Sequence, residues 1–120
     1  MARYSDARGR FVRGEDLTLH ASGPETATVQ GPWFNTEEVN TLDLYLNVTA
    51  ASGTTPSMTV SIETREGAAD TPATVGSFAA KTGVASERKR FTGVGKECRY
   101  VATITGTTPS LTFALTGVSK

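Results

Sequence analysis

The chain has 120 residues, and its 12 basic and 12 acidic side chains give a formal net charge of zero. This length allows one domain whose core needs neither disulfides nor metals, and the single cysteine, Cys98, excludes an internal disulfide. No apolar run is long enough to span a bilayer and the first residues do not resemble a signal peptide, so we expect no membrane association.

Residues 1–15 show neither helical nor strand periodicity, and they predict an extended N-terminal arm. This segment is rich in arginine and contains isolated aromatic side chains. Such an arm orders when its arginines find carboxylates and its aromatic rings find pockets on a neighbouring subunit. The candidate partner-binding residues of the arm are therefore Arg3, Arg8, Arg10, Phe11 and Arg13. The alternative is a frayed terminus without a role.

From residue 16 onwards, alternation of apolar and polar residues predicts a β domain that covers residues 16–120. Segments 16–21 and 26–30 indicate two short strands, which are separated by Gly and Pro. The pair Trp33 and Phe34 then follows a Gly-Pro turn, and we expect it to fill one end of the core because aromatic side chains bury the most area. A sugar ring stacked on Trp33 is the alternative.

A repeated stretch organises the rest of the chain. Residues 52–62 (SGTTPSMTVSI) return 53 positions later, at 105–115, as TGTTPSLTFAL. In each copy a Gly and a Pro indicate a chain reversal, and strict alternation follows. Alternation also precedes each copy, at 42–49 and 100–105. We therefore predict two β-hairpins of similar length.

Shorter elements lie between the two repeats. Residues 65–72 are small and polar and predict a surface loop, and residues 74–79 indicate a weak strand. Residues 87–91 have the charge density of a solvated edge strand, in which Arg88 and Arg90 discourage unwanted pairing.

These patterns give about eight short strands and no helical periodicity. Twenty threonines fit this reading, because a branched Cβ favours a pleated sheet. One flat sheet would leave a hydrophobic face in water. We therefore predict an all-β fold: a single antiparallel β-sandwich, jelly-roll-like, with an extended N-terminal arm.

The charges are segregated along the sequence. Residues 1–14 carry four arginines against one aspartate, residues 15–80 carry nine acids against one arginine, and residues 86–99 carry five bases against two acids. Complementary patches of this kind steer association. We include Arg88 and Arg90 among the partner-binding candidates, while ordinary surface charge that keeps a protein in solution is the alternative.

Residues that could perform catalysis are few. His20 and Cys98 both lie in alternating strand patterns without a nucleophile signature, so we interpret both as structural. The adjacent acids at 37–38 would point to opposite sides of an extended chain, and Asp43 and Glu63 would approach each other across the first hairpin. No acidic calcium loop, zinc ligand set or phosphate loop is present in the sequence. We expect no enzyme activity, no metal and no cofactor.

Nucleic-acid binding is the remaining alternative that the residues suggest. Segments 88–91 and 99–100 place aromatic residues beside cations, as single-strand binders do. A dedicated binder is usually clearly basic, whereas this chain is neutral. We expect no specific nucleic acid.

Several segments together resemble the small β-sandwich virion structural proteins of tailed bacteriophages. The segments that carry this resemblance are 31–34 (GPWF), 42–57 (LDLYLNVTAASGTTPS), 60–64 (VSIET), 88–91 (RKRF), 99–101 (RYV) and 106–113 (GTTPSLTF). The GTTPS turn is the most recognisable part. The arm lies outside the resemblance.

The resemblance implies a capsid decoration (cement) protein that binds the major capsid protein and sibling copies. It implies a homo-oligomer, with a trimer favoured, located in the virion and assembled in the host cytoplasm. It carries no active-site residues, and it does not separate decoration from a neck or tail role. The alternative function is a carbohydrate-binding or adhesin module of a phage head or tail, in which Trp33, Tyr45 and loop hydroxyls contact a surface glycan.

Overall fold

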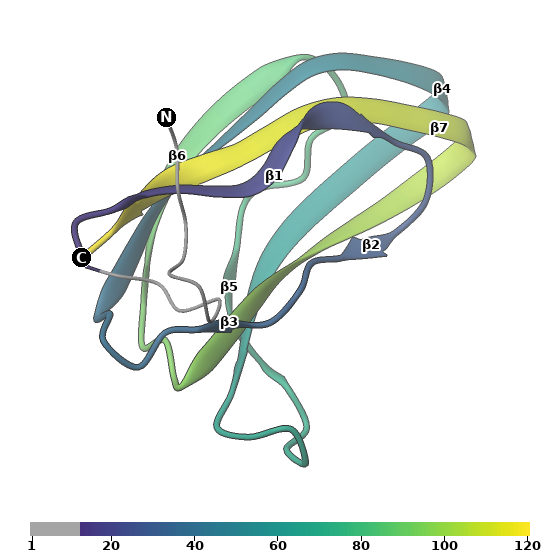
Figure 1. The fold of residues 1–120 in the computed structure, drawn as a ribbon. Helices are drawn as coiled ribbons and strands as arrows, with labels where there is room; N and C mark the ends of the chain where they lie inside the picture. The colour runs from purple at the N-terminus through teal and green to yellow at the C-terminus, as the bar shows by residue number, and fades with distance from the viewer. Residues whose placement is uncertain (1–12) are drawn as a thin grey trace.

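The computed structural model describes residues 13–120 as one antiparallel, hydrogen-bonded sheet of seven strands, with no helix in that range (Figure 1). The strands are β1 (Asp16–Glu25), β2 (Val29–Gln30), β3 (Phe34–Asn35), β4 (Thr41–Arg65), β5 (Ala73–Ser77), β6 (Ala85–Thr92) and β7 (Glu97–Ser119). The main path runs β1-β7-β4-β5; β2 and β3 pair with β7, and β6 pairs with β4. The all-β prediction is confirmed.

The two long strands β4 and β7 pair with each other along almost their whole length. Leu42 lies opposite Ser119 at one end of this ladder, and Arg65 lies opposite Glu97 at the other. The prediction of two separate hairpins is therefore wrong, because the strand before each corner pairs with the strand after the corner of the other copy. Alternation of apolar and polar residues fixes which face a side chain takes, but it does not fix the pairing partner.

The two repeats form corners that pack against each other. Gly53 and Gly106 have positive φ values of 106° and 123°, and Thr55 and Thr108 follow with 48° and 46°. A Cβ placed on Gly53 would lie 2.6 Å from the Thr108 carbonyl oxygen, and one placed on Gly106 would lie 2.8 Å from the Thr55 carbonyl oxygen. Each glycine thus permits both the backbone conformation of its own corner and the close approach of the other corner.

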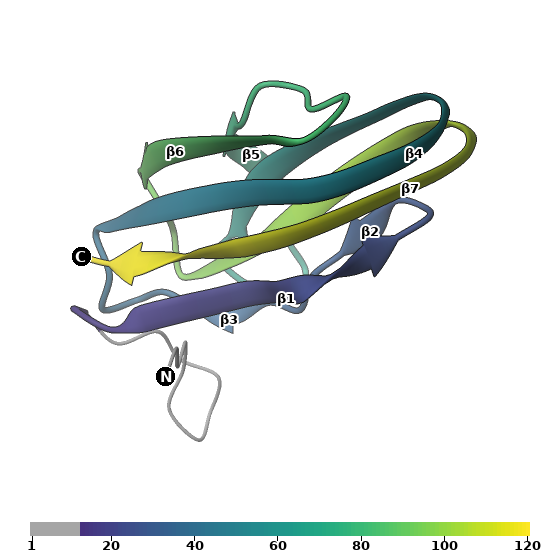
Figure 2. The same ribbon diagram turned by 90° about the horizontal axis from the view of Figure 1, so that it is seen from above.

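The paired β4–β7 ribbon folds back on itself at these corners (Figures 1 and 2). The inward side chains of the two halves enclose one hydrophobic core, and burying each large one contributes roughly 1.5–3 kcal/mol. The largest fully buried side chains are those of Leu17, Leu42, Leu44, Leu46, Met58, Ile62, Phe78, Phe91, Leu111, Phe113 and Leu115.

Side chains close one margin of the folded sheet, between β5 and β6. The rings of Phe78 and Phe91 meet edge to face with their centroids 5.3 Å apart, and the Lys89 ammonium donates to the Ser77 carbonyl oxygen at 2.9 Å. Within the described residues β6 pairs only with β4, which confirms the charged edge strand. The loop expected at 65–72 is also observed, as residues 66–72 lie outside the strands and are mostly exposed.

Candidate interaction surface

The predicted partner-binding residues fall into two groups. Four of them, namely Arg3, Arg8, Arg10 and Phe11, lie outside the described residues. The fifth arm residue, Arg13, is exposed shortly before β1, while Arg88 and Arg90 are exposed on β6. The structure therefore places Arg88 and Arg90 on the same strand, two residues apart and hence on the same face of the sheet.

Arg90 is held by a carboxylate of its own chain. Its Nε and Nη2 atoms donate to the two Asp43 carboxylate oxygens at 2.6 and 3.1 Å, and the Lys120 ammonium reaches the same carboxylate at 3.1 Å. The Asp43 side chain is only 6% exposed, whereas both cations are more than half exposed. The hydrogen bonds from Arg90 and then from Lys120 hold the pKa of Asp43 well below its ordinary value.

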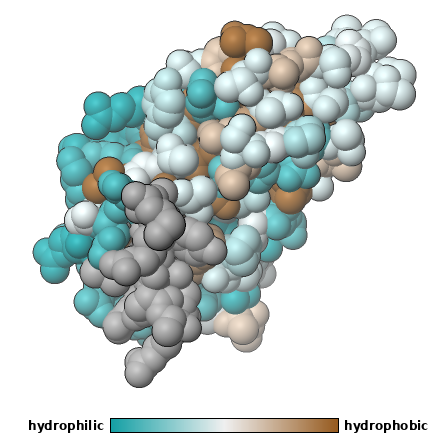
Figure 3. All heavy atoms as spheres, turned by 45° about the horizontal axis from the view of Figure 1, so that its top comes forward, coloured by the Kyte–Doolittle hydropathy of each residue, from teal (hydrophilic) through white to brown (hydrophobic). Residues whose placement is uncertain are grey.

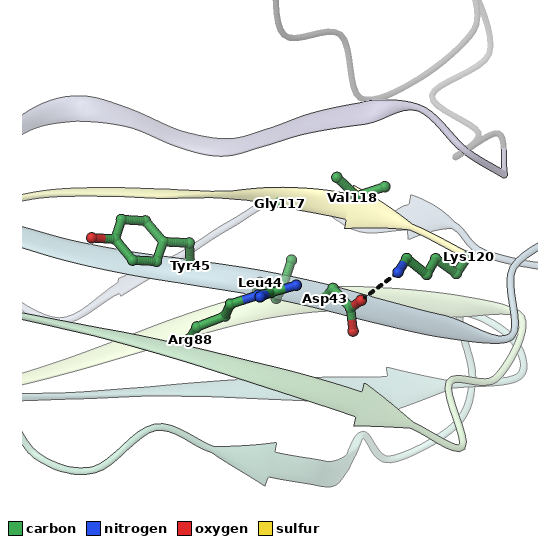
Figure 4. A pocket seen from close by; sticks show the side chains of 7 residues that line it. All are labelled: Asp43, Leu44, Tyr45, Arg88, Gly117, Val118 and Lys120. Carbon is green, nitrogen blue, oxygen red and sulfur yellow. Dashed lines mark ion pairs between the residues drawn. The ribbon is translucent and has the colours of Figure 1, made fainter.

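Arg88 has no such partner. Among the described residues none forms an ion pair or a hydrogen bond with its side chain. Its guanidinium lines a hollow of about 330 Å³ on the outward side of β4 and β7 (Figure 4). The other lining residues are Asp43, Leu44, Tyr45, Gly117, Val118 and Lys120. Tyr45 is 42% exposed, which is unusual for a large side chain of this protein.

Within residues 13–120, acids and bases that are separated in the sequence pair across β4, β6 and β7. Besides the Asp43 pair with Arg90, the Glu63 carboxylate of β4 accepts from Arg99 of β7 at 2.8 Å, and the Glu97 carboxylate of β7 accepts from Arg65 of β4 at 2.7 Å. The prediction that Asp43 and Glu63 approach each other is wrong: they lie in different halves of the folded sheet and are bound to different arginines.

The interpretation of Trp33 and Phe34 as a joint core pair is half correct. Phe34 is buried, but the Trp33 ring is only partly buried and lies against two arginines, with the guanidinium carbons of Arg65 and Arg99 at 4.1 and 4.6 Å from its centroid. The two arginines project outward from the second half of the ribbon. Tyr45 projects outward from the first half, so Trp33 and Tyr45 lie on opposite faces and cannot line a single glycan site.

His20 and Cys98 are bound to different groups and do not form a dyad. His20 contacts the Phe113 carbonyl oxygen at 3.1 Å and the Glu25 carboxylate at 2.8 Å, and its ring stacks on Phe113. Cys98 is buried and accepts from the Thr36 hydroxyl at 3.6 Å, and burial raises the pKa of its thiol. In residues 13–120 no three or more metal-ligating side chains of His, Cys, Asp or Glu cluster.

The surface of the molecule is polar on the side that Figure 3 shows, where hydrophobic residues are scattered and do not form one continuous patch. The described chain also contains no helix with the length and hydrophobicity of a membrane span. Contacts on this side therefore depend on polar and charged groups more than on apolar area.

Sequence reasoning did not bring three residues together with Arg88: Asp43 as the partner of Arg90, Tyr45 as the neighbouring exposed ring, and Lys120 as the second cation. A signal for two of them was present, because Asp43 and Tyr45 alternate with buried leucines in a strand and must face outward together. No known protein-family model matches the chain, and no curated protein matches its sequence at a significant level.

Proposed function

We propose that this protein is a non-enzymatic structural protein of a bacteriophage virion, acting as a capsid decoration (cement) protein that binds the major capsid protein and sibling copies. The observation that carries the proposal is which charged side chains are paired within the chain and which stay exposed. Three ion pairs, Arg65–Glu97, Arg90–Asp43 and Arg99–Glu63, link one strand to another, while Arg88 and Tyr45 stay exposed on a broad sheet face. A stiff body that presents a few fixed polar groups suits assembly, because preorganised groups lose little entropy on docking.

We infer that the folded-over sheet belongs to the jelly-roll-like β-sandwiches. Counting the two halves of β4 and of β7 separately gives nine strand segments, close to the eight of that architecture. The inward apolar positions of both halves share one core, which supports the inference.

The proposal is tested by the stoichiometry of the chain in purified particles. A copy number comparable with that of the major capsid protein is expected for decoration, and a small fraction of it would indicate a connector or tail role. Particles assembled without the chain should lose resistance to heat or to mechanical load. Equally robust particles, or absence of the chain from them, would contradict the proposal.

The proposed homo-oligomer is tested separately, by light scattering of the purified protein. We expect a homo-oligomer with closed symmetry, and the resemblance to phage virion proteins favours a trimer. A monomer at all accessible concentrations would contradict this part of the proposal and would leave the virion role open to the stoichiometry experiment.

A further inference from the structure

Arg88 and Arg90 occupy equivalent positions on β6, but only one of them is neutralised. Arg90 lies opposite Asp43 in the β4–β6 ladder, and Arg88 lies opposite Tyr45. The Asp43 carboxylate accepts from Arg90 through both oxygens, and Lys120 adds a third contact. The side chain of Arg88 therefore meets an uncharged neighbour where that of Arg90 meets an acid.

The immediate surroundings carry an excess of positive charge. Three cations, Arg88, Arg90 and Lys120, lie in or beside the hollow with one carboxylate, that of Asp43. Two of them, Arg90 and Lys120, lower the pKa of Asp43, since nearby cations favour the charged form of an acid. An added anion would experience the same attraction.

The hollow beside Arg88 has the shape and lining for a small anionic group with an apolar neighbour. Its volume is about 330 Å³, and Val118 and the Tyr45 ring provide apolar contact next to the Arg88 side chain (Figure 4). Gly117 adds no side chain to it. Gly117 lies opposite the buried Leu44 in the β4–β7 ladder, so a Cβ there would point to the inner face of the sheet and clash with the Asp43 carbonyl oxygen and the Leu44 side chain.

We propose that this hollow binds the carboxylate of an Asp or Glu side chain from an acidic segment of a partner protein. Arg88 forms the charge-assisted hydrogen bonds, and Tyr45 packs against the residue beside the acid. This assignment rests on the proposed function in taking the occupant to be a protein. It divides the two arginines of β6 into one that binds the partner, Arg88, and one that stabilises the sheet, Arg90.

The lining favours a carboxylate on a side chain over a free phosphate at this position. Val118 and the Tyr45 ring offer apolar contact, which the hydrocarbon part of a Glu side chain and its neighbouring residue can use and inorganic phosphate cannot. The chain as a whole is neutral, which also disfavours a polyanion such as a nucleic acid. Binding of phosphate is kept as one outcome of the test.

The test is a ¹H–¹⁵N NMR titration of the full chain with the peptide acetyl-Gly-Leu-Glu-Leu-Gly-amide, with its Gln counterpart, and with inorganic phosphate. We expect the Glu peptide to shift the amide signals of Tyr45, Arg88 and Val118 at millimolar concentration. Arg88→Gln should weaken binding about tenfold or more, as loss of a charge-assisted hydrogen bond implies. Lys89→Gln is the matched control, since that side chain binds the Ser77 carbonyl on the other side of the strand.

Three results would overturn the proposal: no shift with the Glu peptide, equal shifts with the Gln peptide, or phosphate binding tighter than the Glu peptide. Unchanged binding by Arg88→Gln would overturn it as well. Because the titration uses isolated protein, its failure leaves the particle stoichiometry unaffected. Conversely, a chain that is missing from particles but binds the Glu peptide through Arg88 would refute the virion role and retain the carboxylate site.

Discussion

The reciprocal packing of the two corners predicts a graded response to Gly→Ala substitution at four positions. In Gly53→Ala and Gly106→Ala the new methyl group meets backbone atoms of the other corner at 2.6 and 2.8 Å, and the φ values are 106° and 123°. Gly93 has a positive φ of 74° but open space around it, and Gly83 has open space without a positive φ. The four sites therefore separate backbone strain from steric clash.

The magnitudes follow from three contributions to the free energy of unfolding. A left-handed conformation costs an L-residue about 1–2 kcal/mol. Overpacking against groups that cannot move costs about 1–3 kcal/mol more. Replacing Gly by Ala also lowers the conformational entropy of the unfolded chain, which offsets about 0.4–1 kcal/mol of the destabilisation. We thus expect a destabilisation of about 2–4 kcal/mol for Gly53→Ala and Gly106→Ala, about 1 kcal/mol for Gly93→Ala, and no loss for Gly83→Ala.

The assay is urea unfolding followed by far-UV circular dichroism, with the slope of the transition checked for constancy across the series. The double variant Gly53→Ala/Gly106→Ala should lose less stability than the sum of the two single variants, because both methyl groups disturb the same interface between the two corners. If Gly53→Ala and Gly93→Ala differ by less than about 0.5 kcal/mol, the corners do not support each other and the reasoning is refuted.

Three further predictions concern single side chains. Asp43→Asn should destabilise the fold by about 1–3 kcal/mol near neutral pH. The pKa of Asp43 in the folded protein lies below its ordinary 3.8, so the stabilisation by its carboxylate is complete above pH 3.8 and is lost as the pH falls further. The Tm difference between Asp43→Asn and wild type should therefore narrow on acidification, and a constant difference would contradict this. Trp33→Ala should cost about 1–2 kcal/mol by calorimetry, as expected for two cation–π contacts; a loss of about 3–5 kcal/mol would place the ring in the core after all. Cys98 should react slowly with iodoacetamide in the native protein and fully in urea, by mass spectrometry, because burial raises its pKa; rapid native labelling would contradict the buried thiol.

Local patterns predicted which segments are extended and which side chains are buried, because the alternation of apolar and polar residues is a property of each segment alone. They did not predict where strands end, since β1 continues through Gly23 and Pro24, and β4 and β7 each continue through a repeat. Leu42, Leu44 and Leu46 are buried as the alternation requires, and the charged segment around Arg88 is an edge strand. The partners of these strands could not be read in the same way. The corner at Gly53 and Thr55 reverses the direction of β4. The two halves of β4 that it joins do not pair with each other, because each pairs with β7, which contains the other repeat.

The surface was harder to predict than the core, since its properties arise from residues distant in sequence. Arg90 and Arg88 look equivalent in the sequence, and only the register of β6 on β4 gives one an acid and the other a tyrosine. Trp33 is likewise of a residue type that is usually buried in a core, and the sequence does not indicate that Arg65 and Arg99 lie against its ring.

The long β4–β7 ladder has a consequence for synthesis on the ribosome. Leu42 acquires its β7 neighbour only when Ser119 has been made, and the central ladder is closed by contacts between segments that are far apart in the chain. Such long-range closure slows folding and leaves apolar strands uncovered while the chain grows. We therefore expect the nascent protein to depend on chaperones until its last strand emerges, and its two repeats to be unable to fold one at a time.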